Sequence, residues 1–327
     1  MIKNTLHFGN PAYLSIKNSQ LVIKLPEVEK NDTLPESFKA ESVRTIPIED
    51  IGVVVIDNKQ ITFTSGLMEA LLDNNCAVIT CDSKSMPQGL LLPLEKNTTQ
   101  SERFQAQIDA SLPLKKQLWQ QTVQQKIENQ AAVLSQCKMQ NVKCKITENV
   151  PVTNMLKWAS DVKSGDSDNL EGRAAAYYWK NIFATKIEDF TRGKDGVPPN
   201  NLLNYGYAIL RAVVARALVA SGLLPTLGIH HHNKYNAYCL ADDVMEPYRP
   251  FVDKLVAGIV NEEIEQCRNL EIELTKEIKV KLLQIPVLDV IIGGQRSLLM
   301  SAAGQTTASL AKCYLGEIRK IAYPVFQ

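Results

Sequence analysis

The spacing of apolar residues changes near residue 100, and this change most constrains the fold. Before it, Leu14, Ile16, Leu21 and Ile23 have the spacing of a half-buried hairpin around a Lys-Asn-Ser turn. The short apolar run Val53–Ile56 is bounded by aspartates and rich in β-branched residues, which is typical of a buried strand. The pattern predicts a small β-rich domain in the first part of the chain.

Three segments interrupt these strands. The polar stretch EVEKNDTLPESFKAES, residues 27–42, predicts a loop. A helix over Gly66–Leu72 is predicted, with Ser65 as its cap, before strand formation resumes at Cys76. Residues 86–100 contain two prolines and a glycine and predict a linker between domains.

After residue 100 the pattern is helical almost to the end. Ser101 is the predicted cap of the first helix, and the next helix carries an apolar stripe at close to helical spacing. The stripe consists of Leu118, Val123, Ile127, Ala131 and Leu134. Pro198-Pro199 precedes a long apolar helix closed by Gly222. The predicted fold class is α+β: a β-rich domain over 1–85, a linker over 86–100, and an all-α domain over 101–327.

Composition excludes several classes of protein. The sequence contains no run of about 18 apolar residues, so no membrane span is predicted. Its N-terminus lacks the apolar core of a secretory signal. The seven cysteines are scattered without a C-x-x-C pair, as expected for reduced thiols in a cytosolic protein. Net charge is +1, but residues 101–200 carry 14 Lys and Arg against 11 Asp and Glu. That excess permits nucleic-acid binding, and a solvated helical surface explains it equally well.

The first candidate functional residues are a cluster of histidines and a glutamate that is predicted to face the protein interior. Three of the four histidines are consecutive, His230, His231 and His232, in a turn that follows an apolar helix. Glu171 begins the helix EGRAAAYYWKNIF, where an acidic side chain also complements the helix dipole. Because Ala174 and Tyr178 share its helical face, this carboxylate is predicted to face the protein and to need a divalent cation or an arginine as partner.

A third candidate is the acidic segment DDVMEPYRP, residues 242–250. Asp243 and Glu246 match a capping box at a helix start. These two acids, together with Asp242 and Arg249, equally suit a metal and phosphate site. Two carboxylates with one imidazole suit Mn²⁺ or Mg²⁺ better than Zn²⁺. No P-loop, G-x-S-x-G or H-E-x-x-H motif is found.

These segments resemble a known family. NLEGRAAAYYW, NYGYAIL and GLLPTLGIHHHNKYNAYCLADDVMEPYRP are similar to the CRISPR-associated protein 1 family, the integrases of CRISPR spacer acquisition. The resemblance covers nearly the whole chain, and DDVMEPYRP resembles the branch found in type II systems. It implies a β-rich N-terminal domain that dimerises and a larger helical catalytic domain. It also implies a prokaryotic cytoplasmic location.

The resemblance also implies site residues. The family's metal ligands are a Glu, a His and an acid, which correspond here to Glu171, His231 and Glu246. The family's G-x-x-H pattern selects His231 among the three histidines, and its D-x-x-E/D pattern selects Glu246. Asp243, which opens that pattern, is implied as an accessory acid. Three basic residues near these positions in the sequence are candidate DNA contacts: Arg173, Lys234 and Arg249.

The implied activity is metal-dependent DNA cleavage and integration, with Mg²⁺ or Mn²⁺ as cofactor. The 3′-hydroxyl of a captured DNA fragment attacks a phosphodiester at the leader-end repeat, and each strand is joined in turn. The implied partners are a second copy of the chain, a dimer of CRISPR-associated protein 2, double-stranded DNA and the type II effector nuclease. Two alternatives are a non-catalytic DNA-binding scaffold of the same fold and a different divalent-metal phosphodiesterase.

Overall fold

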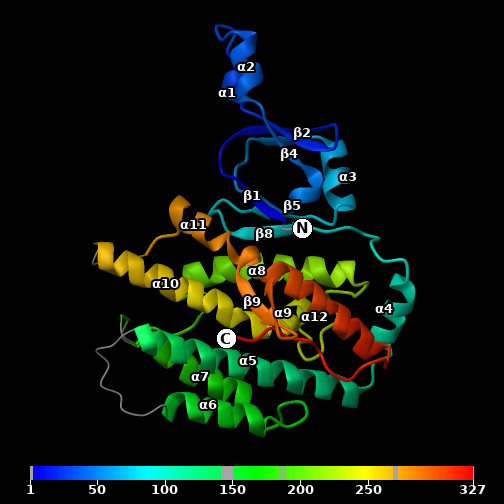
Figure 1. The fold of residues 1–327 in the computed structure, drawn as a ribbon, viewed down its shortest axis with the longest axis vertical. Helices are drawn as coiled ribbons and strands as arrows, with labels where there is room; N and C mark the ends of the chain where they lie inside the picture. The colour runs from blue at the N-terminus through cyan, green and yellow to red at the C-terminus, as the bar shows by residue number, and fades with distance from the viewer. Residues whose placement is uncertain are drawn as a thin grey trace. The chain divides into compact units, whose positions relative to one another are not determined.

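The chain divides into two compact units, Met1–Thr98 and Thr99–Gln327. The structure, a computed structural model, describes residues 3–140, 150–184, 186–187, 189–193, 195–267 and 272–326. The first unit is built on β-sheets and the second is mostly helical, which confirms the α+β prediction (Figure 1).

The first unit holds two four-stranded sheets. One sheet has the order β1-β5-β7-β8 and the other the order β4-β3-β2-β6. In chain order its elements are β1 (Asn4–Phe8), β2 (Ala12–Lys17), β3 (Gln20–Lys24), α1 (Pro26–Glu29), α2 (Glu36–Ser42), β4 (Arg44–Pro47), the 3-10 helix η1 (Ile48–Asp50), β5 (Ile51–Ile56), β6 (Ile61–Phe63), α3 (Ser65–Asp73), β7 (Ala77–Cys81) and β8 (Pro87–Leu91).

The predicted hairpin is present with the expected register. Strands β2 and β3 pair antiparallel, with Leu14 opposite Ile23 and Ile16 opposite Leu21. Because side chains alternate between the two faces of a sheet, Leu14 and Leu21 both enter the core, where each is 1% exposed. They pack there with residues of β5, β7 and α3.

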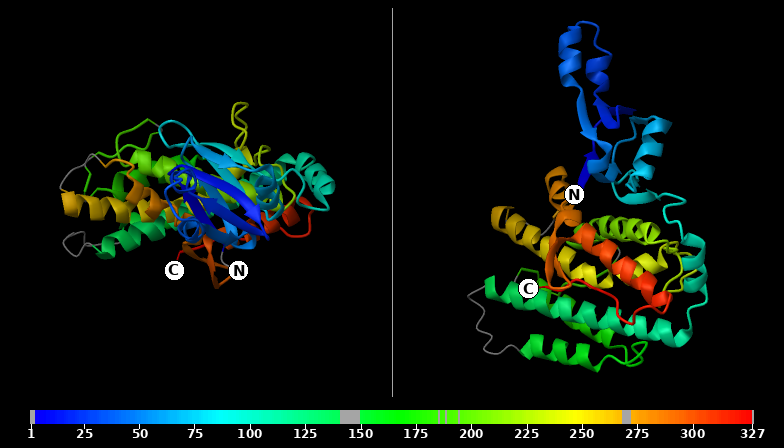
Figure 2. Two further views of the ribbon diagram at one scale, coloured as in Figure 1. Left: turned by 90° about the horizontal axis from the view of Figure 1, so that it is seen from above. Right: turned by 45° about the vertical axis from the view of Figure 1, so that its right-hand side comes forward.

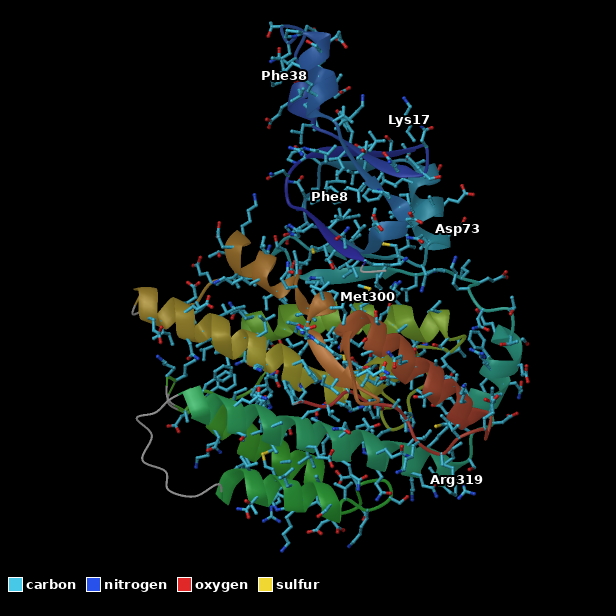
Figure 3. The ribbon with its side chains drawn as sticks, viewed as in Figure 1. Phe8, Lys17, Phe38, Asp73, Met300 and Arg319 are labelled. Atoms are coloured by element: carbon cyan, nitrogen blue, oxygen red, sulfur yellow. The ribbon has the colours of Figure 1, made fainter. Side chains whose placement is uncertain are left out.

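Two local expectations in the first unit are wrong. The predicted loop over 27–42 contains α1 and α2, because Pro26 and Pro35 stand at helix starts, where the missing N–H breaks no helical bond. Thr64, rather than Ser65, caps α3: its hydroxyl accepts from the N–H of Leu67 at 3.4 Å. Figure 3 shows Phe38 of α2, which is 51% exposed.

The predicted linker over 86–100 also contains a strand. Pro87–Leu91 forms β8, which pairs antiparallel with β7 at the edge of its sheet. A proline is tolerated at the first position of an edge strand, so the Pro-Gly content of this segment did not indicate a linker. The unstructured part of the connection is therefore shorter than predicted.

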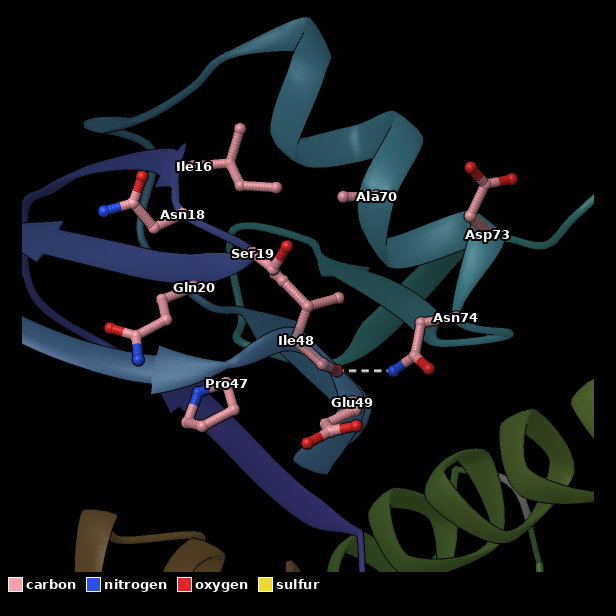
Figure 4. Close-up of a pocket in the computed structure, with 10 residues that line it drawn as sticks. All are labelled: Ile16, Asn18, Ser19, Gln20, Pro47, Ile48, Glu49, Ala70, Asp73 and Asn74. Carbon is pink, nitrogen blue, oxygen red and sulfur yellow. Dashed lines mark hydrogen bonds between the residues drawn. The ribbon is translucent and has the colours of Figure 1, made fainter.

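A pocket of the first unit lies between the hairpin turn and the end of α3 (Figure 4). Asn18, Ser19 and Gln20 line one side, and Asp73 and Asn74 line the other. The Asn74 side chain donates to the carbonyl of Ile48 and so ties the end of α3 to η1. With two acids and no histidine among its lining residues, this pocket resembles no predicted site.

The second unit is a helical assembly with one small hairpin. Its elements are α4 (Gln100–Ile108), α5 (Leu112–Gln140), α6 (Val150–Asp161), α7 (Leu170–Ile182), α8 (Asn200–Ala220), α9 (Cys239–Met245), the 3-10 helix η2 (Glu246–Tyr248), α10 (Arg249–Cys267), α11 (Lys276–Leu282), the 3-10 helix η3 (Ile285–Val287), β9 (Asp289–Ile292), β10 (Gln295–Leu298) and α12 (Leu299–Tyr314). The hairpin of β9 and β10 is an addition to the all-α prediction.

Two long helices organise this unit. Helix α5 contacts α6, α7 and α10, and α8 contacts α9, α10 and α12, as the views of Figures 1 and 2 show. The five apolar residues predicted for the stripe of α5 are at most 1% exposed. Ser101 does not cap α4, because that helix already begins at Gln100 after Thr99.

Helix α8 is the one described helix long and apolar enough to cross a membrane, yet 78% of its most apolar window is buried inside the protein. Burial of this kind is expected of a core helix. Cys239 and Cys313 are buried thiols outside any disulfide, as predicted, whereas Cys144 lies outside the described residues.

Candidate functional site

Glu171 stands in the first turn of α7, as predicted. The side chain of Asn169 accepts from the N–H of Gly172 at 3.3 Å, and Asp166 accepts from the N–H of Glu171 at 3.0 Å. These bonds satisfy N–H groups that have no partner within the helix. Ala174 and Tyr178 on the same face are fully buried, so the Glu171 carboxylate faces the protein, with 23% of its side chain exposed.

The partner of Glu171 is a lysine that sequence reasoning missed. The Nζ atom of Lys126 on α5 lies 2.6 Å from Oε1 of Glu171 and 2.6 Å from Oε2 of Glu246. Its side chain is only 10% exposed. Burial lowers the pKa of Lys126, but the two carboxylates outweigh burial and hold that pKa above its ordinary value.

Lys126 could have been found from its position on the helix. It lies three residues after Val123 and four before Gln130, so it belongs to the buried face of α5. A lysine on the buried face of a helix requires an anionic partner, because an unpaired buried charge is strongly unfavourable.

Glu246 lies at the junction of α9 and η2, and its side chain is 6% exposed. Its Oε1 atom lies 3.0 Å from Nε of Arg249, whose guanidinium covers the Tyr207 ring at 4.7 Å. Burial raises the pKa of Glu246, but Arg249 and Lys126 outweigh it and lower that pKa below its usual value. The carboxylate is therefore held ionised inside the protein.

Asp243 holds the histidine turn in place. Its Oδ2 atom accepts from the N–H of Ile229 at 2.6 Å and of His230 at 2.9 Å. Its Oδ1 atom bonds Nδ1 of His231. The capping-box interpretation is wrong, because Asp243 lies within α9 and caps a distant turn instead of its own helix.

The close approach of this turn to Asp243 explains the Gly-x-x-His spacing. A Cβ atom at Gly228 would lie 2.2 Å from the carbonyl oxygen of His231 and 2.9 Å from Oδ2 of Asp243. Both distances are shorter than contacts that real Cβ atoms make, so only glycine fits here without moving the turn. Gly228 thus allows the backbone N–H groups to reach the carboxylate.

The three histidines have different environments. The ring of His230 stacks on Trp119 of α5, with centroids 4.3 Å apart and planes 4° apart. His231 meets the edge of Trp119 and bonds Asp243, with 44% of its side chain exposed, and His232 is exposed as well. Trp119 is a further residue that sequence reasoning missed. It sits on the same buried face of α5 as Lys126.

Several carboxylates act on the His231 imidazole. Its hydrogen bond with Asp243 raises its pKa above 6.5, burial opposes this, and Glu246 and Glu171 raise the pKa further. A carboxylate only accepts hydrogen bonds, so Nδ1 carries the proton in that bond, and the neutral ring presents Nε2 as a lone-pair donor. This is the arrangement of a metal-ligating histidine oriented by a carboxylate.

The side chains of Glu171, Glu246 and His231 are of types that bind divalent cations, but their arrangement in this structure is not that of a metal site. No three His, Cys, Asp or Glu side chains within the described ranges lie close enough to share a metal ion. The Lys126 ammonium stands between the two glutamates instead. Oε2 of Glu246 is ion-paired with Lys126 but makes no well-directed hydrogen bond within the described part of the chain. Two hard oxygen donors and one imidazole suit Mg²⁺ or Mn²⁺.

The candidate DNA contacts divide into two groups. Arg173 lies over the Trp158 ring at 4.7 Å and Lys234 over the Tyr235 ring at 4.9 Å, and both residues are exposed. Arg249 is instead engaged with Glu246, with 25% of its side chain exposed. Arg249 is therefore better placed to neutralise the charge of Glu246 than to contact a DNA phosphate.

A buried carboxylate lies behind the site. Asp253 of α10 accepts from the hydroxyl of Tyr178 at 3.1 Å and from the hydroxyl of Tyr207. It is 1% exposed, and burial raises its pKa to about 7. Tyr207 thereby links Asp253 to the guanidinium of Arg249. No sequence pattern indicates this network, which joins α7, α8 and α10.

Comparison with known proteins identifies the relatives of this chain. A family model described as CRISPR associated protein Cas1 matches residues 7–284. The CRISPR-associated endonuclease Cas1 of Neisseria meningitidis serogroup C is 40% identical over 240 residues, which are 73% of each chain. This similarity is consistent with the branch that DDVMEPYRP indicated.

Two solved structures share the fold. A casposase bound to integration product has a TM-score of 0.75 at 21% identity, covering 98% of this chain and 92% of the other. A chain of a partial Cas6-RT-Cas1–Cas2 complex has a TM-score of 0.63 at 18% identity, covering 99% of this chain and 100% of the other. At these identities the likeness extends to the fold alone.

Proposed function

The chain belongs to the CRISPR-associated protein 1 family, and from this premise we propose that it is a metal-dependent DNA endonuclease and integrase. Its reaction joins a short DNA fragment to a CRISPR array by attack of a 3′-hydroxyl on a phosphodiester. The proposal assigns Glu171, His231 and Glu246 as metal ligands and Asp243 as the acid that orients His231.

One observation carries the proposal. Segments far apart in the sequence bring two carboxylates and a carboxylate-oriented imidazole to one place in the second unit. Glu246 and Glu171 lie near enough to raise the pKa of His231, so the three assigned side chains form one electrostatic cluster. Perturbed titratable groups gathered in this way are typical of catalytic sites.

The chain's own residues prepare the site before any ligand binds. Asp243 fixes the ring orientation of His231, and Lys126 and Arg249 keep Glu246 ionised. A bound Mg²⁺ or Mn²⁺ would stabilise negative charge on the phosphate undergoing transfer. Catalysis of this kind depends on positioning and electrostatics, so residues that fix the ligands are as necessary as the ligands themselves.

The proposed partners follow from the family and its structural neighbours. A neighbour is a casposase bound to integration product, and another belongs to a complex with Cas2. We extend these associations to this chain: a homodimer that dimerises through the first unit, binds a dimer of CRISPR-associated protein 2 and takes double-stranded DNA. Cooperation with a type II effector nuclease belongs to the same proposal.

The test is integration of a short duplex into a plasmid that carries a leader and repeat. The wild-type protein with its partner should form half-site products in Mn²⁺ or Mg²⁺ and none in EDTA. Glu171→Gln and Glu246→Gln should abolish the products. Lys163→Met, which changes an exposed lysine paired with Asp168, should not. Wild-type product from both glutamine variants would refute the ligand assignment.

One observation favours a second function, a DNA-binding scaffold without catalysis. The Lys126 ammonium already satisfies both glutamates, as a structural ion pair would. A scaffold would bind branched and duplex DNA normally but would neither cleave nor join it with Mn²⁺, Mg²⁺ or EDTA. A nuclease assay on branched DNA with these three additions separates the two functions.

A further inference from the structure

Lys126 bridges the two glutamates that are proposed as metal ligands. Its Nζ atom lies 2.6 Å from one oxygen of Glu171 and 2.6 Å from one oxygen of Glu246. The other oxygen of Glu246 faces Arg249. Hence each oxygen of the more buried glutamate is already engaged by a positive charge.

A divalent cation would compete for the same atoms. Mg²⁺ binds oxygen at about 2.0–2.1 Å, so an ion shared by the two glutamates would lie against the ammonium. Two cations at that separation repel each other strongly in a partly buried site. The ammonium and a divalent cation therefore cannot both remain between the carboxylates.

We propose that Lys126 is a built-in competitor of the divalent cation: it bridges Glu171 and Glu246 when no metal is bound and must leave them when one binds. The inference rests on the proposed metal site and adds a residue that sets its affinity. Without the lysine, two carboxylates would share a partly buried site with only Arg249 as counter-charge, which is unfavourable.

The net charge of the site supports the competition. Three carboxylates of the cluster face two fixed cations, Lys126 and Arg249, which leaves one negative charge when His231 is neutral. Removing Lys126 would leave two negative charges, and the site would then attract a divalent cation more strongly. The lysine thus weakens metal binding while it stabilises the metal-free protein.

The experiment measures metal affinity directly. Free Mn²⁺ is followed by electron paramagnetic resonance during titration of the full-length protein, with no DNA present. Lys126→Met, a neutral side chain of similar length, should bind Mn²⁺ at least about tenfold more tightly than wild type, the low end of coupling energies for close charge pairs. Lys126→Arg keeps the charge and should stay near the wild-type affinity.

Thermal unfolding supplies the second readout. In EDTA the methionine variant should unfold at a lower temperature than wild type, and saturating Mn²⁺ should raise its unfolding temperature by more. Lys163→Met removes a lysine whose side chain is 67% exposed and should change neither quantity. If Lys126→Met does not fold, Lys126→Gln removes the same charge, keeps a hydrogen-bond donor and should show the same increase in affinity.

The outcomes distinguish this inference from the function on which it rests. Equal Mn²⁺ affinity for wild type and the neutral variants would overturn the competition and leave the metal site standing. No Mn²⁺ binding by any variant would overturn both. Binding by a neutral variant alone, lost again when Glu246→Gln is added, would support the competition in its strongest form.

Discussion

Asp243→Asn is the substitution that most sharply tests how the site is held. The wild-type carboxylate accepts from the N–H of Ile229 at 2.6 Å and of His230 at 2.9 Å, and it is 0% exposed. Asparagine has nearly the same shape but only one acceptor oxygen. If that oxygen keeps the two backbone bonds, the amide nitrogen must face His231.

The expected loss follows from the charge of the acceptor. A hydrogen bond to a charged group contributes about 1.5–3 kcal/mol and a neutral one about 0.5–1.5 kcal/mol. The two backbone bonds should therefore lose about 2 kcal/mol together, which corresponds to a roughly thirtyfold increase in local opening. The amide hydrogens of Ile229 and His230 should exchange faster by about that factor.

The same substitution changes the tautomer of His231. An amide N–H₂ donates where the carboxylate accepted, so Nδ1 must become the acceptor and the ring proton must move to Nε2. A protonated Nε2 cannot serve as a ligand, and strand transfer should fall below detection even though every ring atom stays in place. DNA binding should be retained, because no phosphate contact is removed.

The measurement is hydrogen exchange by mass spectrometry on peptides that cover residues 228–232, combined with the integration assay. Asp242→Asn is the matched control, since the neighbouring Asp242 bonds Arg211 and Asn236 and makes no bond to residues 229–231. Unchanged exchange in Asp243→Asn, or equal acceleration in the control, would show that Asp243 does not hold this turn.

Three further predictions concern other parts of the site. His231→Ala should abolish integration, whereas His232→Ala should retain most of it, because Asp243 bonds and orients the ring of His231; equal losses would contradict a single ligand. Arg173→Ala should weaken binding to all DNA sequences alike and reduce the slope of log K against log salt by about one unit, measured by anisotropy. The pKa of Asp253 is about 7, so the folded chain binds a proton between about pH 4 and 7 that the unfolded chain lacks. The free energy of unfolding should thus fall as pH rises through this window, by up to about 4 kcal/mol, and Asp253→Asn should lack that loss in thermal unfolding between pH 5 and 8.

Patterns with a fixed period were predicted correctly from the sequence. The hairpin of β2 and β3 has the expected residues opposite each other, because alternation and a tight turn determine its register. The apolar stripe of α5 is buried as expected. Such signals are local, and tertiary contacts only reinforce them.

Features that depend on distant partners could not be predicted. Asp243 and Glu246 have the spacing of a capping box, yet the structure places both inside a continuous helical segment. Asp243 instead accepts hydrogen bonds from the backbone N–H groups of the turn at 229–231, which are more than a helix start would supply. The contact between this turn and α9 depends on the tertiary fold, so the sequence pattern alone could not predict it.

The ionisation of Glu246 depends on two basic residues, Lys126 and Arg249. Burial alone would raise the pKa of Glu246 and favour its neutral form, which is a poor ligand for a hard cation. Lys126 and Arg249 reverse that effect from α5 and α10, so the carboxylate is ionised before any metal arrives. In the proposed metal site, the same counter-charges would weaken the binding of the metal. The pairs that keep Glu246 ionised would therefore lower the metal affinity, and substitution of Lys126 measures this effect.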